Sequence, residues 1–444
     1  MGEGFGGYKA FVIAVLVLVT IGMSGPDASS NFASLRTQRR PTKILDFAAA
    51  PESGFTRLFG GLFRRGTPGR VQLEPLPTEG GTAPAAPGSD PAPPNGGTNP
   101  LYSEETAIPS NFDISSYLVP AWGSGAIPPD NGVDPVGAFR FICGGGQVRY
   151  DDPIVYPGQP GDSHLHQFYG NTAADAYSTY SSLRQTGDST CGDPLNRSGY
   201  WMPALLDGRG HVVQPDYVSI YYKRLPASDP HCNDPSRTDL KAEGICVPIP
   251  NGIRFIFGYD MLTGTPRTGG NQFLCVAGNN PTGTYETLRE LASAGCAAGN
   301  HVELMISAPT CWDGKHLDSA NHRDHVAYPT YGSWGYLRCD AAHPYVMPRF
   351  QMSVFYTIAK GDDLKLWHLS SDEMMPGIAA GTTFHADYFE GWDNKTMAMW
   401  MDNCINKHLN CSGGDLGNGS QLRGAARPSY GWSNPNRLVP VPAR

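Results

Sequence analysis

The sequence predicts a mainly β protein, an antiparallel β-sandwich or jelly-roll-like single domain with long loops, disulfide bonds and few short helices. Glycine (54) and proline (39) are abundant among the 444 residues, and charged residues make up only 17%. Short runs of apolar, β-branched and aromatic residues alternate with turn residues. Neither an internal repeat nor the βαβ rhythm of a parallel sheet interrupts this pattern, so we expect antiparallel sheets.

The first hundred residues are expected to lie outside this domain. Residues 1–25 carry an apolar run after Lys9 that is short for a membrane span, which favours a signal peptide or an N-terminal membrane anchor. Residues 26–100 form a Pro/Gly/Ala-rich tether with few core-forming side chains, for which disorder is expected. The globular domain is then predicted to span residues 101–444.

Within the domain, apolar and β-branched runs mark the strands. The alternation is clearest in residues 349–358, where Phe350, Met352 and Val354 fall on one face. Residues 285–297 are the best helix candidate, with Leu288 and Leu291 facing inward. The strand candidates are residues 139–143, 217–222, 252–258, 301–307 and 349–358.

The cysteines and the charge balance restrict compartment and partners. All ten cysteines lie between Cys143 and Cys411, and none forms C-x-x-C, so zinc-ribbon and thioredoxin-like sites have no support. An even number favours disulfides formed in an oxidising compartment, with buried free thiols as the alternative; the pairing stays open. We expect a protein that is secreted or anchored at the outer face of the membrane. The net charge of −8 makes nucleic acid an unexpected partner.

Five of the twelve histidines gather in two short segments. In residues 162–171 (D-S-H-L-H-Q-F-Y-G-N), an extended backbone would place His164 and His166 on one face, where they could bind one metal or one substrate group. In residues 311–329, His322 and His325 are three apart and would share one side of a helical turn. The alternative for both segments is histidines that are hydrogen-bonded to the backbone of a loop.

A third segment, residues 384–393 (F-H-A-D-Y-F-E-G-W-D), spaces a histidine and an aspartate two apart. We expect the histidines to act as general acid/base groups or metal ligands in one cleft and Asp387 to orient an imidazole. The predicted catalytic residues are His164, His166, His322, His325, His385 and Asp387, and the first four are the alternative ligands of a divalent metal such as Zn²⁺, Cu²⁺ or iron. The predicted substrate-binding residues are Tyr169, Trp201, Trp312, Lys315, Asp318 and Trp392.

Seven motifs carry a resemblance to a known family. They are D-P-I-V-Y-P-G-Q-P (152–160), S-H-L-H-Q-F-Y-G-N (163–171), Y-W-M-P-A-L (200–205), N-G-I-R-F-I-F-G (251–258), C-W-D-G-K-H-L-D-S (311–319), H-R-D-H-V-A-Y-P (322–329) and H-A-D-Y-F-E-G-W-D (385–393). Over residues 139–404 the chain resembles domain-of-unknown-function family nineteen-ninety-six, a secreted domain of actinobacteria and fungi often found beside WSC carbohydrate-binding modules. His316 stands where that family is expected to have asparagine, and Gln167 where it is expected to have aspartate, so His316 is left out of the site. The resemblance implies a surface or secreted domain in carbohydrate-rich surroundings, without a settled activity.

Three functions remain open at this point. The first is a polysaccharide hydrolase with Asp318 and Asp387 as its carboxylates, or a lyase in which Lys315 or Arg323 neutralises a uronate. The second is an extracellular metal enzyme built on the histidines. The third is a non-catalytic module that binds a cell-envelope glycan through the three tryptophans named above. In each case the expected partner is a polysaccharide.

Overall fold

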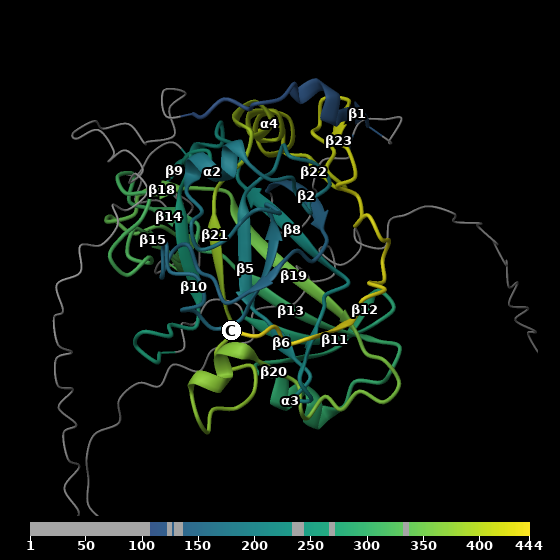
Figure 1. Ribbon diagram of the computed structural model, residues 1–444. Coiled ribbons are helices and arrows are strands. Elements are labelled where there is room, and N and C mark those ends of the chain that lie inside the picture. The colour runs from purple at the N-terminus through teal and green to yellow at the C-terminus, as the bar shows by residue number, and fades with distance from the viewer. Residues whose placement is uncertain (1–106, 122–126, 128–135, 233–243, 266–270, 332–336) are drawn as a thin grey trace, which may run out of the picture.

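The computed structural model describes residues 107–121, 127, 136–232, 244–265, 271–331 and 337–444. The predicted N-terminal segment (1–25) and tether (26–100) lie outside these residues. The described chain is mainly β, with antiparallel sheets and few short helices, as the sequence predicts (Figure 1).

The larger sheet has seven strands, and it contains four of the five predicted strand segments. Its order is β12-β11-β13-β19-β8-β2-β22, antiparallel except for the last pair. The bounds are β12 Asn280–Tyr285, β11 Gln272–Ala277, β13 His301–Ser307, β19 Arg349–Thr357, β8 Tyr217–Arg224, β2 Gly137–Cys143 and β22 Asn410–Cys411.

The second sheet has five antiparallel strands in the order β10-β21-β5-β4-β3. It contains the fifth predicted segment. The bounds are β10 Arg254–Gly258, β21 His385–Phe389, β5 Gly199–Pro203, β4 His166–Gly170 and β3 Val148–Arg149.

The main core lies between these two sheets and is rich in aromatic rings. Phe350 of β19 contacts Tyr200 of β5 and Tyr388 of β21, with ring centroids 6.0 and 4.8 Å apart. All three side chains are buried. Each such ring contributes about 1.5–3 kcal/mol by leaving water, so this inner face fixes the position of the five-stranded sheet.

The opposite face of the five-stranded sheet carries both polar and apolar side chains. Because side chains alternate along a strand, His385 and Asp387 of β21 lie on this outer face. Trp201 of β5 is the cross-strand partner of Asp387 of β21, and it belongs to a smaller apolar cluster on this face. Gly170 ends β4 with a φ of +82°, a backbone conformation that favours glycine.

Smaller sheets and short helices surround this pair. A four-stranded sheet in the order β20-β6-β7-β24 comprises His368–Leu369, Leu205–Leu206, His211–Val213 and Leu438–Pro440. Another, β15-β14-β18-β9, comprises Val326–Ala327, Cys311–Trp312, Tyr345–Val346 and Ile245–Cys246. There are also two two-stranded sheets. One pairs β1 Leu118–Pro120 with β23 Ser420–Leu422, and the other pairs β16 Thr330–Tyr331 with β17 Leu337–Arg338.

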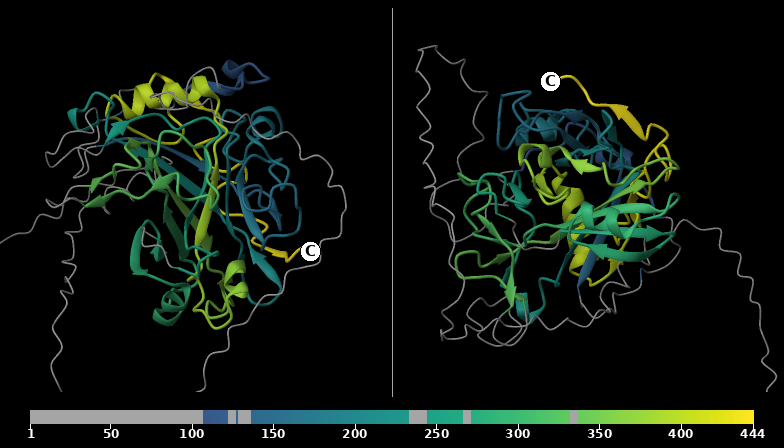
Figure 2. Two further views of the ribbon diagram at one scale, coloured as in Figure 1. Left: turned by 90° about the vertical axis from the view of Figure 1, so that its left-hand side faces the viewer. Right: turned by 90° about the horizontal axis from the view of Figure 1, so that it is seen from below.

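The helices are η2 Ile114–Tyr117, α2 Tyr180–Gln185, η3 Pro230–Cys232, α3 Leu288–Ala294, η4 Ser370–Met374, α4 Asn394–Trp400 and the π-helical turn η5 Met401–Ile405. Helix α3 lies inside the predicted segment 285–297, and Leu288 and Leu291 are its buried residues, as predicted. Figure 2 shows the helices around the outside of the sheets, and α2 packs Tyr180 and Leu183 on the outer face of the five-stranded sheet.

All ten cysteines pair in five disulfides, and none is free. Five disulfides are typical of an oxidising compartment outside the cytoplasm. Within the described part of the chain, no helix combines the length and the apolar character that crossing a membrane requires. The pairs are Cys143–Cys191, Cys232–Cys246, Cys275–Cys296, Cys311–Cys339 and Cys404–Cys411.

Candidate functional site

Three imidazole rings meet on the outer face of the five-stranded sheet. The ring centroid of His164 lies 4.1 Å from that of His166 and 5.0 Å from that of His385. One nitrogen from each ring can be chosen so that all three lie within 4.8 Å of one another. Within the described residues, these three histidines form the one group of at least three potential metal-binding side chains whose ligand atoms lie this close together.

Strand register explains why the rings meet. His166 begins β4 and pairs with Pro203 of β5, while His385 begins β21 on the other side of β5. Asp387 pairs with Trp201, so His385 lies level with Pro203, two residues further along β5. The compact proline between the two histidines leaves room for their rings, whose centroids are 6.2 Å apart. His164, two residues before His166, points to the same side.

Backbone carbonyls orient two of the rings. His166 donates from Nδ1 to the oxygen of Asp151 at 2.9 Å, and His385 donates from Nδ1 to the oxygen of Thr383 at 2.8 Å. Because a carbonyl can only accept, Nε2 of each neutral ring carries the free lone pair. Nε2 of His164 and Nε2 of His166 are buried without a hydrogen-bond partner. A metal-binding histidine usually donates a hydrogen bond from one ring nitrogen and binds the metal through the lone pair of the other.

Burial keeps these imidazoles neutral. Burial, together with the neighbouring His166, lowers the pKa of His385 to about 3. Burial also lowers the pKa of His164 well below its ordinary value, again with help from the other two rings. The pKa of His166 is lowered by burial, although the nearby Asp152 opposes this. Neutral imidazole is the form that binds metal, so no proton has to be removed near pH 7.

Two buried carboxylates stabilise the segments that supply the orienting carbonyls. Asp372 of η4 accepts from the backbone N–H groups of Leu369 and Gly381 at 2.8 and 2.7 Å, and from the hydroxyl of Thr383 at 2.6 Å. Asp152 accepts from the backbone N–H groups at positions 154 and 155. The carbonyls that face His166 and His385 therefore belong to tightly bonded turns.

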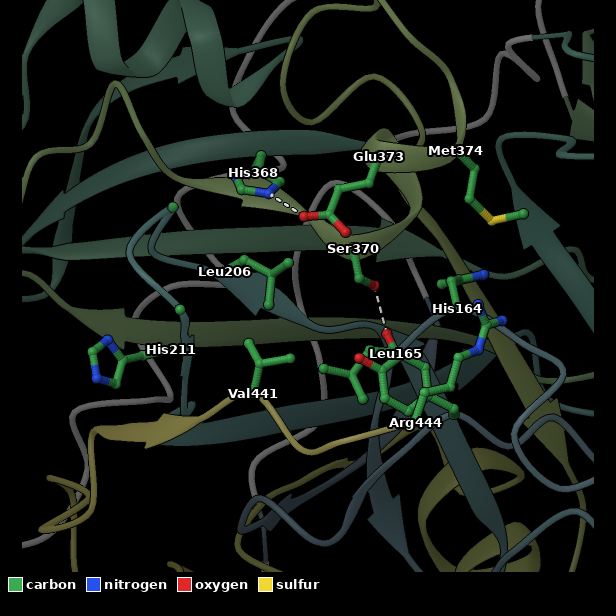
Figure 3. Close-up of a pocket in the computed structure, with 13 residues that line it drawn as sticks. His164, Leu165, Leu206, His211, His368, Ser370, Glu373, Met374, Val441 and Arg444 are labelled. Atoms are coloured by element: carbon green, nitrogen blue, oxygen red, sulfur yellow. Dashed lines mark hydrogen bonds and ion pairs between the residues drawn. The ribbon is translucent and has the colours of Figure 1, made fainter.

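A pocket of about 480 Å³ opens beside the three histidines, and His164 is part of its wall (Figure 3). His164 is partly exposed, whereas His166 and His385 are buried, so the pocket reaches the group through His164. Its wall also contains Tyr150, Leu165, Leu206, Gly208, Gly210, His211, His368, Ser370, Glu373, Met374, Val441 and Arg444.

Asp387 lies on the same strand face as His385 but makes no hydrogen bond to an imidazole. Both of its carboxylate oxygens are buried without a partner. Burial raises its pKa well above the ordinary value, and Asp152 raises it further. The predicted role of Asp387 in orienting an imidazole is therefore wrong.

His322 and His325 lie beside β10 and are not part of the three-histidine group. His322 binds Asp318 through Nδ1 at 2.8 Å. His325 donates from Nε2 to the carbonyl of Arg254 at 2.9 Å and accepts from the hydroxyl of Ser319 at 2.9 Å. The predicted single cleft is thus corrected to three histidines, and for this pair the hydrogen-bonded loop is the right interpretation.

The predicted substrate-binding aromatics are in the interior. Tyr169, Trp201, Trp312 and Trp392 are all 0% exposed, so none of them offers a ring to a sugar, and that prediction is wrong. Trp392 packs on Phe141 in the main core instead.

The predicted polar substrate contacts also lie outside the pocket wall. Asp318 is paired with Arg254 at 2.9 Å, and Lys315 is exposed. Arg323 is buried and donates to the carbonyls of Ile256 and Tyr259. The pocket residues Arg444, His211, His368 and Glu373 were missed because they come from separate parts of the chain and form no motif.

Comparison with known proteins gives a family and no activity. Neither a curated protein nor a solved structure matches the chain. One family model matches residues 152–392, more than half of the chain, and this range includes all three histidines of the group. The chain therefore belongs to the family described as Domain of unknown function (DUF1996).

Proposed function

We propose that this domain is a metal-dependent enzyme of the cell exterior that acts on a polysaccharide, with Zn²⁺ or Cu²⁺ held by His164, His166 and His385. One observation carries the proposal: three neutral imidazoles converge, with their nitrogens within 4.8 Å of one another, at a pocket. Buried nitrogens without a partner are costly, and a shared cation would satisfy them.

The set of donor atoms supports these two metals. Imidazole nitrogen suits Zn²⁺ and Cu²⁺, whereas Ca²⁺ and Mg²⁺ require oxygen, and the common iron site adds a carboxylate to two histidines. Three protein ligands leave a position open for water or substrate, as in catalytic zinc sites. That position would face the pocket through His164. A metal there would lower the pKa of a bound water or polarise a substrate oxygen.

The pocket favours metal-assisted chemistry over a two-carboxylate glycosidase. Among the described residues of the pocket wall, Glu373 is the one acidic side chain, whereas both glycosidase mechanisms need two carboxylates. The non-catalytic module loses its support because the three tryptophans it depends on are buried. A polysaccharide substrate is supported by the extracytoplasmic setting that the disulfides indicate and by an open pocket with polar and aliphatic walls.

The test is metal analysis of the purified full chain, after metal removal and reconstitution with Zn²⁺ or Cu²⁺. We expect one equivalent in the wild type, none in the double variant His164→Ala/His166→Ala, and one equivalent in His211→Ala, which changes the pocket wall but not the group. The metal-loaded wild type, and not the double variant, should shorten one member of a panel of cell-envelope polysaccharides. Equal metal content in wild type and double variant would refute the proposal.

A further inference from the structure

The pocket contains one arginine, Arg444, beside the three-histidine group. Its guanidinium donates to the carbonyls of Gly161 at 2.9 Å and Ser163 at 3.1 Å, and it lies over the ring of Tyr150 with 5.5 Å to the centroid. Ser163 is the residue directly before His164. These contacts fix the cation next to the histidine that opens the group to the pocket.

The acceptors of Arg444 are neutral carbonyls, so they orient its charge without cancelling it. No aspartate or glutamate side chain among the described residues forms an ion pair with this guanidinium. At the other end of the pocket, His211 lies 3.0 Å from Asp207 and His368 lies 3.1 Å from Glu373. The pocket thus has a guanidinium beside the histidine group and two histidine–carboxylate pairs away from it.

Aliphatic side chains connect the two ends. Figure 3 shows Leu206 and Val441 between His211 on one side and His164 with Arg444 on the other. A sugar ring presents C–H groups on its faces and hydroxyls around its edge, so it suits an aliphatic floor with polar groups at both ends. The arrangement fits an elongated ligand with a negative charge at the Arg444 end.

We propose that the pocket binds an acidic oligosaccharide, with the carboxylate of a uronate residue on Arg444. This inference rests on the proposed function and names the substrate class of the same site. A guanidinium binds a carboxylate through two parallel hydrogen bonds, which sets orientation as well as affinity. The bound uronate places its neighbouring sugar over the aliphatic floor and its reacting end beside His164. Arg444 therefore replaces Lys315 and Arg323, which the sequence favoured for this role.

The test is calorimetric titration of the full chain with tetragalacturonate and with neutral cellotetraose, in the metal-free and the metal-loaded protein. We expect wild type to bind the acidic tetramer at least about ten-fold more tightly than the neutral one, because charge-assisted hydrogen bonds from Arg444 reach only the acidic ligand. Arg444→Gln should abolish this preference, and it should weaken in high salt. The matched control is Arg427→Gln, the same change at an exposed arginine outside the pocket, which should keep the preference.

A second variant tests whether the ligand lies on the aliphatic residues between the two ends of the pocket. Val441→Asp adds a negative charge to the aliphatic floor and should weaken binding of tetragalacturonate much more than binding of cellotetraose. Equal affinity of Arg444→Gln and Arg427→Gln for tetragalacturonate, with both variants melting like wild type, would overturn the inference.

Failure of the inference and failure of the metal proposal give different results. If the protein binds one metal but shows no preference for the acidic tetramer, the substrate class is refuted and the metal centre stands. If it binds no metal but shows a preference that depends on Arg444, the metal centre is refuted and the acidic ligand stands.

Discussion

Zinc should stabilise this protein against heat, and His166→Ala should abolish the effect. A ligand present at one hundred times its dissociation constant stabilises the native state by about 2.7 kcal/mol. Unfolding entropy is about 2.1 cal/mol/K per residue, so residues 107–444 carry roughly 0.7 kcal/mol/K in total. Dividing this free energy by this entropy predicts that Zn²⁺ raises the melting temperature by about 4 °C above that of the metal-free protein.

His166 is the best position for this test because it is fully buried and its Nδ1 is already held by the carbonyl of Asp151. Alanine removes one ligand of three, and two imidazoles are too few for a stable site. The assay is scanning calorimetry of chelator-treated protein with and without Zn²⁺. His211→Ala serves as the control and should keep the 4 °C rise. The reasoning fails if Zn²⁺ leaves the wild type unchanged, or if it shifts His166→Ala as much as the wild type.

Three further predictions concern the groups around the site. Burial lowers the pKa of His325 to about 4, so its unfolded form takes up the proton first as pH falls below 6.5; wild type should lose about 2.5 kcal/mol between pH 7 and 4.5 from this group, and urea unfolding of His325→Asn should show a correspondingly flatter pH dependence. Asp372→Ala frees the turn whose Thr383 carbonyl orients His385, and competition with a zinc chelator should show about ten-fold weaker binding; unchanged affinity would contradict that role. Trp392→Ala should lower the unfolding free energy in urea by about 3–5 kcal/mol, whereas a surface platform for sugar would leave it nearly unchanged.

The sequence predicted the strands well because their pattern is local. Residues 301–307 coincide with β13, and the H-x-H pair lies on one side as alternation requires. The helical turn predicted from the spacing of His322 and His325 was wrong. Residues 319–325 form a non-helical turn in which His322 has a φ of +57°. The nearby Asp318 and Ser319 then take up their ring nitrogens.

Long-range features were harder to predict. His385 joins the H-x-H pair only through the register of β4, β5 and β21, which no local pattern contains. The exposure of tryptophan was misjudged because a ring that suits a sugar also suits a core. Arg444 has no motif around it and gains its meaning only from its place beside Ser163.

The level alignment of His166 and His385 across Pro203 has a consequence for how the protein matures. The two strands come from distant parts of the chain, so the complete site exists only after a long loop has closed and β21 has docked on β5. The H-x-H pair alone offers an incoming ion too few ligands. If the proposed metal binds here, loading would follow folding, and a chain that folds in an oxidising compartment would take its metal from that compartment. The identity of the bound ion would then depend on the metals available in that compartment as much as on the chemistry of three imidazoles.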